Sequence, residues 1–274
     1  MVIPVYNRAG SILRSVCSVL QQTIPPREVF VVDDGSTDKT CAIVSAIPGV
    51  SLVHTGGRRG ANFARNMGSK LACAEWIAYQ DSDDAWLPGK MEATASALSE
   101  CGESVEWCFS RFIRLVSGSV SGAPAALMNN LDSQWRFLSR QERKRFATVN
   151  LASTQTIVVK RCLFDSIGGF DECLGRFQDW DFALRLLDRS DPLVICDPTV
   201  VVYGTEGSIT TNFEAGLEAR RKMLLKEYGL LKEGSFGRRR FLMSLAIREA
   251  ANMEMRSAFL SLRRSLFGRE MVSS

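Results

Sequence analysis

Short apolar runs alternate with amphipathic stretches through the first hundred residues of the chain. The apolar runs are rich in β-branched or aromatic residues and are bounded by turn formers, which is typical of buried strands. We expect strands at residues 2–5, 29–32, 51–54 and 76–80. The stretches between and after them predict helices at residues 10–22, 39–46, 61–74 and 88–98. Strand–helix alternation at this spacing favours βαβ units, so the sequence predicts an α/β fold with a Rossmann-like, mainly parallel sheet flanked by helices.

The pattern is less regular between residues 101 and 212. Residues 117–130 are rich in Ser, Gly, Ala and Asn and predict a loop, and the polar stretch 131–150 predicts a partly helical segment. The strands expected in this region are residues 105–115, 155–159 and 200–203, and the expected helix is 177–189.

From residue 213 to the end, the pattern is helical, with an interruption near Gly234 and Ser235. This end is basic, because residues 214–274 hold 13 Lys and Arg against 7 Asp and Glu. We therefore expect one domain over residues 1–212, with halves of about 1–100 and 101–212, and a basic helical extension over 213–274. Two interpretations of the basic face stay open: a solvated face of helices that pack on the domain, or a peripheral contact with an anionic inner-membrane surface.

Two clusters of carboxylates directly follow two of the predicted strands. One contains Asp33 and Asp34, and the other contains Asp81, Asp83 and Asp84. In an open parallel sheet the carboxyl ends of strands face the crevice where ligands bind. Like charges gathered there repel one another, and Mg²⁺ or Mn²⁺ relieves such repulsion through carboxylate oxygens together with substrate phosphates. The alternative for each cluster is a turn that caps the helix after it.

Two further segments carry candidate chemistry. The glycines and arginines of residues 56–60 precede a helix, so their backbone amides could bind an anion, although the spacing fits neither the dinucleotide fingerprint nor the P-loop. A basic surface loop is the alternative. Asp179 and Asp181 are two residues apart on a predicted helix and point about 200° apart, so one faces a pocket and the other faces solvent or a partner such as Arg185. Trp180 between them is expected in the core.

Composition narrows the class of protein. The chain of 274 residues is 46% hydrophobic and 23% charged, which is ordinary globular composition. No apolar run reaches the roughly 18 residues of a membrane span, and the start does not resemble a secretory signal. The eight cysteines form no Cys-x-x-Cys pair, which indicates reduced, mostly packed thiols and a cytoplasmic location. The single histidine argues against a histidine metal site or a Ser-His-Asp triad, but leaves His54 as a candidate general base.

Six short motifs, taken in order, resemble those of the family 2 glycosyltransferases with the GT-A fold. The resemblance covers residues 1 to about 210. The motifs lie at residues 4–7, 32–38, 60–66, 81–84, 169–171 and 178–181.

The resemblance implies that the half of about 1–100 binds the nucleotide and that the half of about 101–212 binds the acceptor. Tyr6 would stack on the nucleobase, with the backbone of Pro4 beside it. Asp34 would accept a hydrogen bond from the base, and Arg65 would lie near the base or the phosphates.

The remaining roles concern the metal and the chemistry. Asp81 and Asp83 would hold the ribose and the metal, with Asp83 or Asp84 as the direct ligand of Mn²⁺ or Mg²⁺. Asp179 would be the general base that deprotonates the acceptor hydroxyl, and attack on the opposite face of the anomeric carbon would give inversion.

The implied activity is that of an inverting, metal-dependent glycosyltransferase in bacterial surface or extracellular polysaccharide biosynthesis. We expect a UDP-sugar as the donor, a saccharide or lipid-linked saccharide as the acceptor, and no nucleic acid partner. Three positions depart from the family pattern: Gln178 stands where Glu is usual, and Gly204 and Glu206 stand where Arg and His are common. They motivate an alternative in which a weakened GT-A domain acts as a nucleotide-binding or scaffold subunit. A nucleotidyltransferase ranks lower, because the chain has no glycine-rich, lysine-bearing triphosphate loop near its start.

Overall fold

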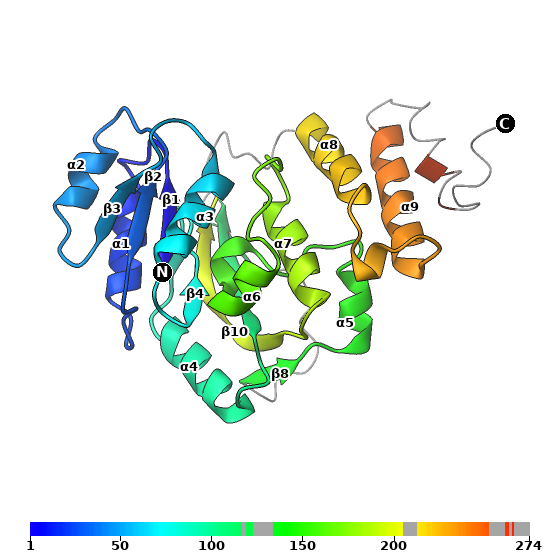
Figure 1. The fold of residues 1–274 in the computed structure, drawn as a ribbon, viewed down its shortest axis with the longest axis horizontal. Coiled ribbons are helices and arrows are strands. Elements are labelled where there is room, and N and C mark those ends of the chain that lie inside the picture. Colours follow the sequence, from blue (N-terminus) through cyan, green and yellow to red (C-terminus); the bar gives the residue numbers. More distant parts are fainter. Residues whose placement is uncertain (117–118, 123–133, 205–212, 252–260, 263–264, 266–274) are drawn as a thin grey trace.

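The computed structural model describes residues 1–116, 119–122, 134–204, 213–251, 261–262 and 265. Its first part is a three-stranded parallel sheet in the order β1-β2-β3, with helices between the strands (Figure 1). The elements are β1 (Val2–Val5), α1 (Ile12–Leu20), β2 (Phe30–Asp33), α2 (Thr40–Ser45), β3 (Ser51–His54) and α3 (Ala61–Leu71). The predicted βαβ pattern of this region is confirmed, with strand and helix ends shifted by a few residues.

A second sheet of seven strands completes the fold. Its path is β4-β9-β6-β10-β5, with β7 paired to β6 and β8 paired to β10. An isolated parallel bridge between Val2 and Tyr79 joins it to β1, and the Gln80 amide donates to the Val2 carbonyl over 3.1 Å. The strands are β4 (Trp76–Ala78), β5 (Ala85–Trp86), β6 (Trp107–Val116), β7 (Ser119–Gly122), β8 (Trp135–Phe137), β9 (Ile157–Lys160) and β10 (Leu193–Tyr203).

The α/β class is confirmed, but the mainly parallel arrangement holds only for β1 to β3. In the second sheet β6 and β10 run parallel, whereas the other pairs are antiparallel. The connection between β6 and β7 is only two residues long, and so short a link can join antiparallel strands but not parallel ones. The loop predicted at 117–130 is therefore wrong at β7, and its residues 117–118 and 123–130 lie outside the described part.

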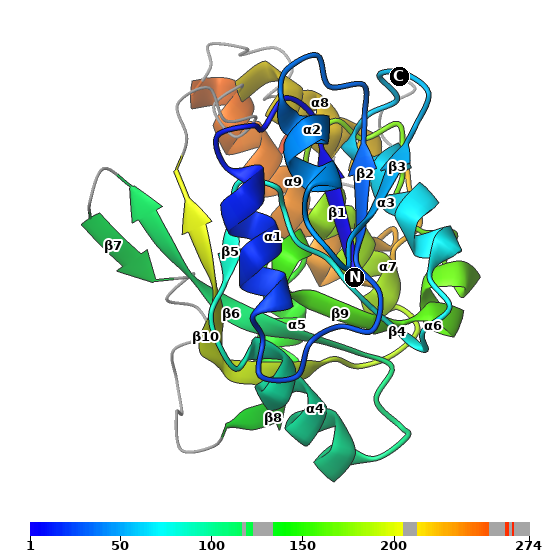
Figure 2. The same ribbon diagram turned by 90° about the vertical axis from the view of Figure 1, so that its left-hand side faces the viewer.

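Helices cover both faces of the sheets, which Figure 2 shows from the side of β1 to β3. The second part of the chain contributes α4 (Lys90–Cys101), α5 (Arg140–Arg145), α6 (Arg161–Ser166), α7 (Gln178–Leu187), α8 (Phe213–Leu224) and α9 (Phe236–Ala251), with short 3₁₀ turns η2 (Thr154–Thr156) and η4 (Gly229–Leu231). Helix α6 and strands β5 and β8 were not predicted, because two to six residues give no readable period.

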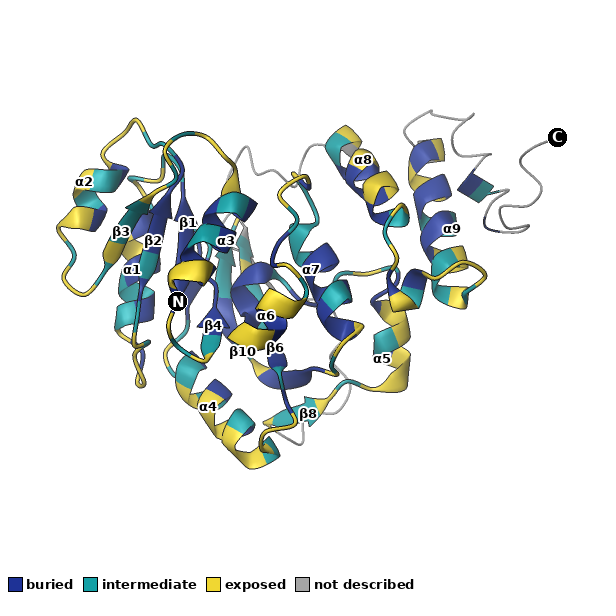
Figure 3. Cartoon of the chain, in the orientation of Figure 1, coloured by how far each residue is buried: buried dark blue, intermediate teal, exposed yellow. Residues whose placement is uncertain are grey.

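Two hydrophobic clusters lie on the opposite faces of the sheets. Side chains of successive strand residues alternate between them, so Val2 and Val32 belong to one cluster while Ile3 and Val31 belong to the other. The first cluster contains side chains of α3, α6, α7 and α9, and the second contains those of α1, α2 and α4. Figure 3 shows the inner helix faces and most of β1, β2 and β4 as buried, whereas β3 and β8 are half-buried or exposed. The protein thus has helix, sheet and helix layers, and the site described below lies where the strands end.

The helical extension is anchored on the domain. Helix α9 begins shortly after Gly234, whose φ of +75° suits the predicted interruption. Phe241 of α9 packs 5.4 Å from the ring of Trp180, and Tyr228 and Leu231 are fully buried in the same cluster. Among the described helices, none has both the length and the apolar character that crossing a bilayer requires.

All eight cysteines are free thiols, as expected. The expectation that most of them are packed holds only in part, because Cys108 and Cys196 are buried whereas Cys73, Cys162 and Cys173 are exposed.

Candidate active site

Asp33 and Asp34, at the end of β2, build the loops around them. The Asp33 carboxylate accepts hydrogen bonds from the amides of Gly35 and Ser36, both over 3.2 Å. Burial opposes ionisation of Asp33, but the hydrogen bonds from Ser36 and its neighbours outweigh it and lower the pKa of this carboxyl. Asp33 therefore forms a turn, but it does not cap the following helix, because α2 has Lys39 at its N-cap and no side-chain hydrogen bond there.

Asp34 holds the glycine-rich loop of residues 56–60. Its carboxylate accepts from the amides of Arg59 and Gly60, each over 2.8 Å, and from the Thr55 hydroxyl over 3.0 Å. The sequence analysis suggested that backbone amides of residues 56–60 could bind an anion. Two of these amides, those of Arg59 and Gly60, donate to the Asp34 carboxylate instead. The expected contact of Asp34 with a nucleobase stays a prediction, and it would use the lone pairs that these bonds leave.

Pro4 and Tyr6 lie at the end of β1. Pro4 is buried and stands opposite Val32 of β2, while Tyr6 is half-buried. The guanidinium carbon of Arg58 lies 4.4 Å from the centre of the Tyr6 ring. A nucleobase could stack on this face of Tyr6 only if Arg58 were displaced. The sequence analysis did not predict the contact between Arg58 and Tyr6.

Arg65 and Asp81 form an ion pair between α3 and the end of β4. The Arg65 Nη2 lies 2.8 Å from Asp81 Oδ1, and its Nη1 donates to the Asn62 side chain over 3.0 Å. Arg65 is only 4% exposed. The structure therefore brings together two of the residues expected around the donor.

Asp83 and Asp84 differ in their surroundings. Asp84 is buried, and its two oxygens accept from the Gln155 side chain over 2.7 Å and from the Tyr203 amide over 2.9 Å. Burial first, and then Asp81 and Asp83, raises the pKa of Asp84 to about 8. Asp83 is more open: its carboxylate lies 3.6 Å from Arg8, and burial together with Asp81 raises its pKa.

This loop fits a divalent cation. Its carboxylate oxygens are the hard ligands that Mg²⁺ and Mn²⁺ prefer. Burial and the neighbouring carboxylates raise the pKa values of Asp83 and Asp84, and a bound cation would favour their ionised forms. Asp83 is the more available ligand, because hydrogen bonds already occupy both oxygens of Asp84. The described residues contain one compact group of three potential ligands, Asp33, Cys41 and His54, and it lies elsewhere, around β2 and β3. The loop is therefore not a complete cage, which suits a cation that also binds substrate phosphates.

His54 lies on β3, the outer strand of the parallel sheet, with its Nδ1 3.3 Å from Asp33 Oδ2. The partner of His54 is thus Asp33, the carboxylate that forms the turn after β2.

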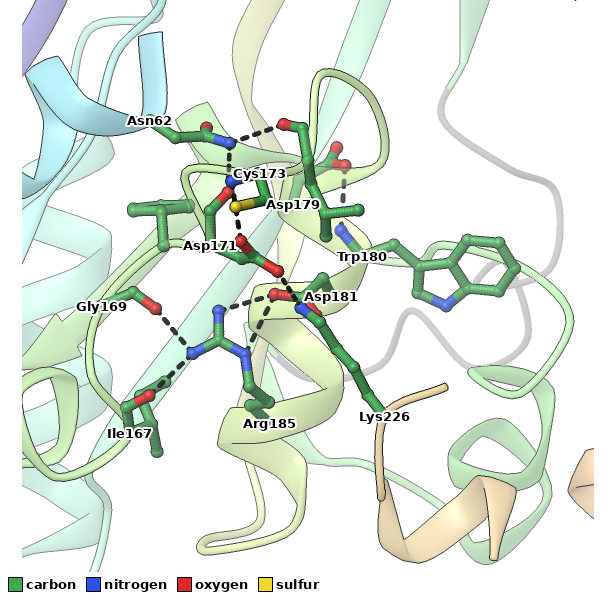
Figure 4. A network of polar contacts seen from close by, with 12 residues as sticks. Asn62, Ile167, Gly169, Asp171, Cys173, Asp179, Trp180, Asp181, Arg185 and Lys226 are labelled. Carbon is green, nitrogen blue, oxygen red and sulfur yellow. Dashed lines mark hydrogen bonds and ion pairs between the residues drawn. The ribbon is translucent and has the colours of Figure 1, made fainter. Parts of the chain in front are cut away.

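Asp179 lies in the first turn of α7 and is half-buried. Its carboxylate accepts from the Trp180 amide over 2.9 Å (Figure 4). Burial raises the pKa of Asp179 to about 6; the charge of Asp81 adds to the rise, while the Trp180 amide and the charge of Arg65 oppose it. A carboxyl with this pKa can accept a proton near neutral pH. The charges of Asp81 and Arg65 both act on this carboxyl, so the three side chains lie within electrostatic reach of one another.

Asp181 points the other way, as the helical spacing predicted. It is fully buried and accepts from Arg185 over 2.7 Å and from the Tyr228 hydroxyl over 2.5 Å. Lys226 bridges Asp181 and Asp171, each over 2.5 Å (Figure 4). Trp180 is buried in the core, as expected, and donates to the Phe146 carbonyl. Asp181 therefore ties α7 to the segment after α8.

Two asparagines of α3 were missed by the sequence analysis. Asn62 donates to the carbonyls of Asp171 and Leu174, each over 2.8 Å. Asn66 both donates to the Phe170 carbonyl and accepts from its amide. They hold the loop before α7 against α3, and the only sequence signal was their position, four residues apart, inside a recognised motif.

Of the positions that depart from the family pattern, Gln178 is the half-buried first residue of α7 and Gly204 is exposed. Glu206 lies outside the described residues.

Comparison with known proteins finds relatives of the chain. A profile described as Glycosyl transferase family 2 matches residues 1–164. The putative colanic acid biosynthesis glycosyl transferase WcaA of Escherichia coli K12 is 26% identical, over 75% of this chain and 72% of its own length. The UDP-Glc:alpha-D-GlcNAc-diphosphoundecaprenol beta-1,3-glucosyltransferase WfgD of Escherichia coli is 36% identical, but over only 36% of this chain and 40% of its own.

Among solved structures, S. aureus TarS 1-349 in complex with UDP-GlcNAc superposes with a TM-score of 0.70. The match covers 91% of this chain and 72% of that one at 20% sequence identity, so it shows a common fold.

Proposed function

Because the chain belongs to glycosyl transferase family 2, we propose that it is an inverting, metal-dependent enzyme that transfers a hexose from a UDP-sugar to an acceptor hydroxyl. The observation that carries this proposal is a chain of contacts: Arg65 donates to Asp81 over 2.8 Å and to Asn62 over 3.0 Å. Asn62 in turn donates to the carbonyls of Asp171 and Leu174, in the loop that leads to Asp179. The UDP-GlcNAc in the TarS structure and the UDP-Glc in the name of WfgD support a UDP-sugar as donor.

In the proposed reaction, Asp179 accepts the proton of the acceptor hydroxyl as that oxygen attacks the anomeric carbon. The diphosphate leaves from the opposite face, so the configuration inverts. Arg65 holds Asp81 in place. Tyr6 and the backbone of Pro4 lie beside the nucleobase of the donor. A divalent cation held by Asp83 and Asp81, with Asp84 fixing the loop, would neutralise the charge of the leaving diphosphate.

The setting we propose is bacterial surface or extracellular polysaccharide biosynthesis, with a saccharide or lipid-linked saccharide as acceptor. The names of WcaA and WfgD, which refer to colanic acid and to a diphosphoundecaprenol acceptor, support it.

A donor screen tests the proposal. We expect hydrolysis of a UDP-sugar in Mn²⁺ or Mg²⁺, weaker or no hydrolysis of GDP- and dTDP-sugars, and loss of activity in EDTA. UDP affinity measured by calorimetry should also fall in EDTA, because the diphosphate then meets the carboxylates of Asp81 and Asp83 without the two positive charges of the metal. Equal UDP affinity with and without the metal would contradict the metal assignment.

A second candidate function rests on Gln178, which replaces a carboxylate next to the proposed base. A weakened domain that serves as a nucleotide-binding or scaffold subunit would bind UDP with metal but would turn over none of the donors in the screen.

A further inference from the structure

A carboxylate, an imidazole and a thiol meet at the ends of β2 and β3. Asp33 ends β2 and His54 ends β3, and these two residues stand opposite each other in the register of the strands. Cys41 lies in the first turn of α2, which packs beside β3 at the left of Figure 1. One potential ligand atom of each side chain lies within 4.8 Å of the other two. The fold thus brings together three different metal-binding groups from three separate segments.

The distances between these groups suit a tetrahedral cation. Two ligands that are each about 2.0–2.1 Å from Zn²⁺ stand about 3.3 Å apart at the tetrahedral angle. Asp33 Oδ2 and His54 Nδ1 are separated by 3.3 Å. A sulfur ligand has a longer bond, of about 2.3 Å, and belongs about 3.6 Å from each of the other ligands. The Cys41 Sγ lies within 4.8 Å of a ligand atom of both residues, so a shift of about 1 Å brings it into place.

Asp33 is held in place, whereas the other two groups are open to solvent. Asp33 is 2% exposed, and its carboxylate accepts hydrogen bonds from the amides of Gly35 and Ser36. Outer hydrogen bonds of this kind fix the orientation of a metal-binding carboxylate. His54 is exposed and Cys41 is half-buried, so a cation can reach the group from solvent.

The charges of the group favour a divalent cation. Despite burial, hydrogen bonds lower the pKa of Asp33, so this carboxyl is ionised. Burial first, and then the hydrogen bond with Asp33, raises the pKa of the Cys41 thiol, so the thiol keeps its proton in the free protein. A metal that binds sulfur displaces this proton. The thiolate and the carboxylate then carry two negative charges, which a divalent cation balances.

We propose that Asp33, Cys41 and His54 bind Zn²⁺, with a water in the fourth coordination position, and that the ion ties α2 to the ends of β2 and β3. Thiolate, imidazole and carboxylate are all ligands of Zn²⁺, whereas Mg²⁺ and Mn²⁺ prefer oxygen ligands alone. The site is therefore distinct from the carboxylate loop that follows β4, and this inference is independent of the proposed function. The sequence analysis argued against a histidine metal site because His54 is the only histidine, and a site that takes one ligand of each kind leaves no spacing signal.

Titration of the reduced, untagged full chain with Co²⁺ tests the site, because Co²⁺ adopts the geometry of Zn²⁺ and absorbs strongly in the near ultraviolet when a thiolate binds it. We expect wild type to take up one equivalent of Co²⁺ with this absorption, and Zn²⁺ to remove the absorption by displacement. Cys41→Ser should lose the absorption. His54→Gln should weaken Co²⁺ binding by at least about 10-fold, since loss of a residue that only orients a ligand already costs about 10- to 100-fold. The matched control is Cys101→Ser, a half-buried cysteine of α4 outside the group, which should behave as wild type does.

The melting temperature provides a second measurement. Because Zn²⁺ bound to the native chain stabilises it, Zn²⁺ should raise the melting temperature of wild type and Cys101→Ser more than that of Cys41→Ser and His54→Gln. Melting of each variant without metal shows whether it folds. If Cys41→Ser does not fold, His54→Gln decides the question alone, because the His54 side chain is exposed.

Absence of the thiolate absorption in wild type, or absorption that persists in Cys41→Ser, would overturn the inference. Wild-type Co²⁺ affinity in His54→Gln would overturn it as well, because His54 would then not be a ligand.

Discussion

Asp179→Asn is expected to lower kcat by about 10²- to 10⁴-fold, the usual cost of losing a general base. The change removes proton acceptance but keeps the shape of the side chain and its position in the first turn of α7. Donor binding should therefore stay close to that of wild type. Initial rates at saturating donor and metal, together with the calorimetric affinity for UDP, measure the two effects separately.

The matched control is Asp191→Asn, which changes the same chemical group in an exposed carboxylate on the loop before β10. It should leave kcat unchanged. If Asp179→Asn keeps nearly wild-type turnover, the base lies elsewhere, and Asp171 is the next carboxylate to replace.

Asp181→Ala is expected to lower the free energy of unfolding by about 3 kcal/mol or more, since removing one partner of a buried ion pair leaves the other charges uncompensated. Asp181 is fully buried and is contacted by Arg185, Lys226 and Tyr228. Its loss should loosen the segment after α8 from α7. Urea unfolding followed by tryptophan fluorescence measures the change.

The control for this prediction is Glu218→Gln, which breaks an exposed pair with Lys222 on α8. Exposed pairs contribute about 0–1 kcal/mol, so this variant should unfold almost as wild type does. Equal stability of the two variants would mean that the buried network does not hold the helices together.

The sequence predicted the first half of the fold well because its signals are local. Strands β1 to β3 are short apolar runs separated by amphipathic helices, and each can be recognised within a few residues. The second sheet depends instead on pairings between distant segments. The pairing of β10 with both β6 and β8 has no local sequence signature. Only residues 200–203 of β10 were predicted as a strand, because Pro198 and two register shifts interrupt the strand pattern before them.

The same distinction holds for the site. Motif order brought Arg65, Asp81 and Asp179 into one hypothesis, and the structure places these three within electrostatic reach of one another. The sequence did not predict which hydrogen-bond partner each of these side chains has. The bonds of Asp34 to the loop of residues 56–60 and of Asp84 to Gln155 depend on how loops return to the strand ends. The contact of Arg58 with Tyr6 likewise appears only when two loops are folded together.

The measurement that tests the account most directly is the dependence of kcat/KM on pH, because kcat/KM reports the ionisations of the free enzyme. The base must be ionised to accept the proton, and burial raises the pKa of Asp179 in the free protein to about 6. The account predicts that kcat/KM is constant near neutral pH and falls about tenfold per pH unit below about pH 6. A kcat/KM that stays constant down to pH 5 would contradict Asp179 as the base of the transfer.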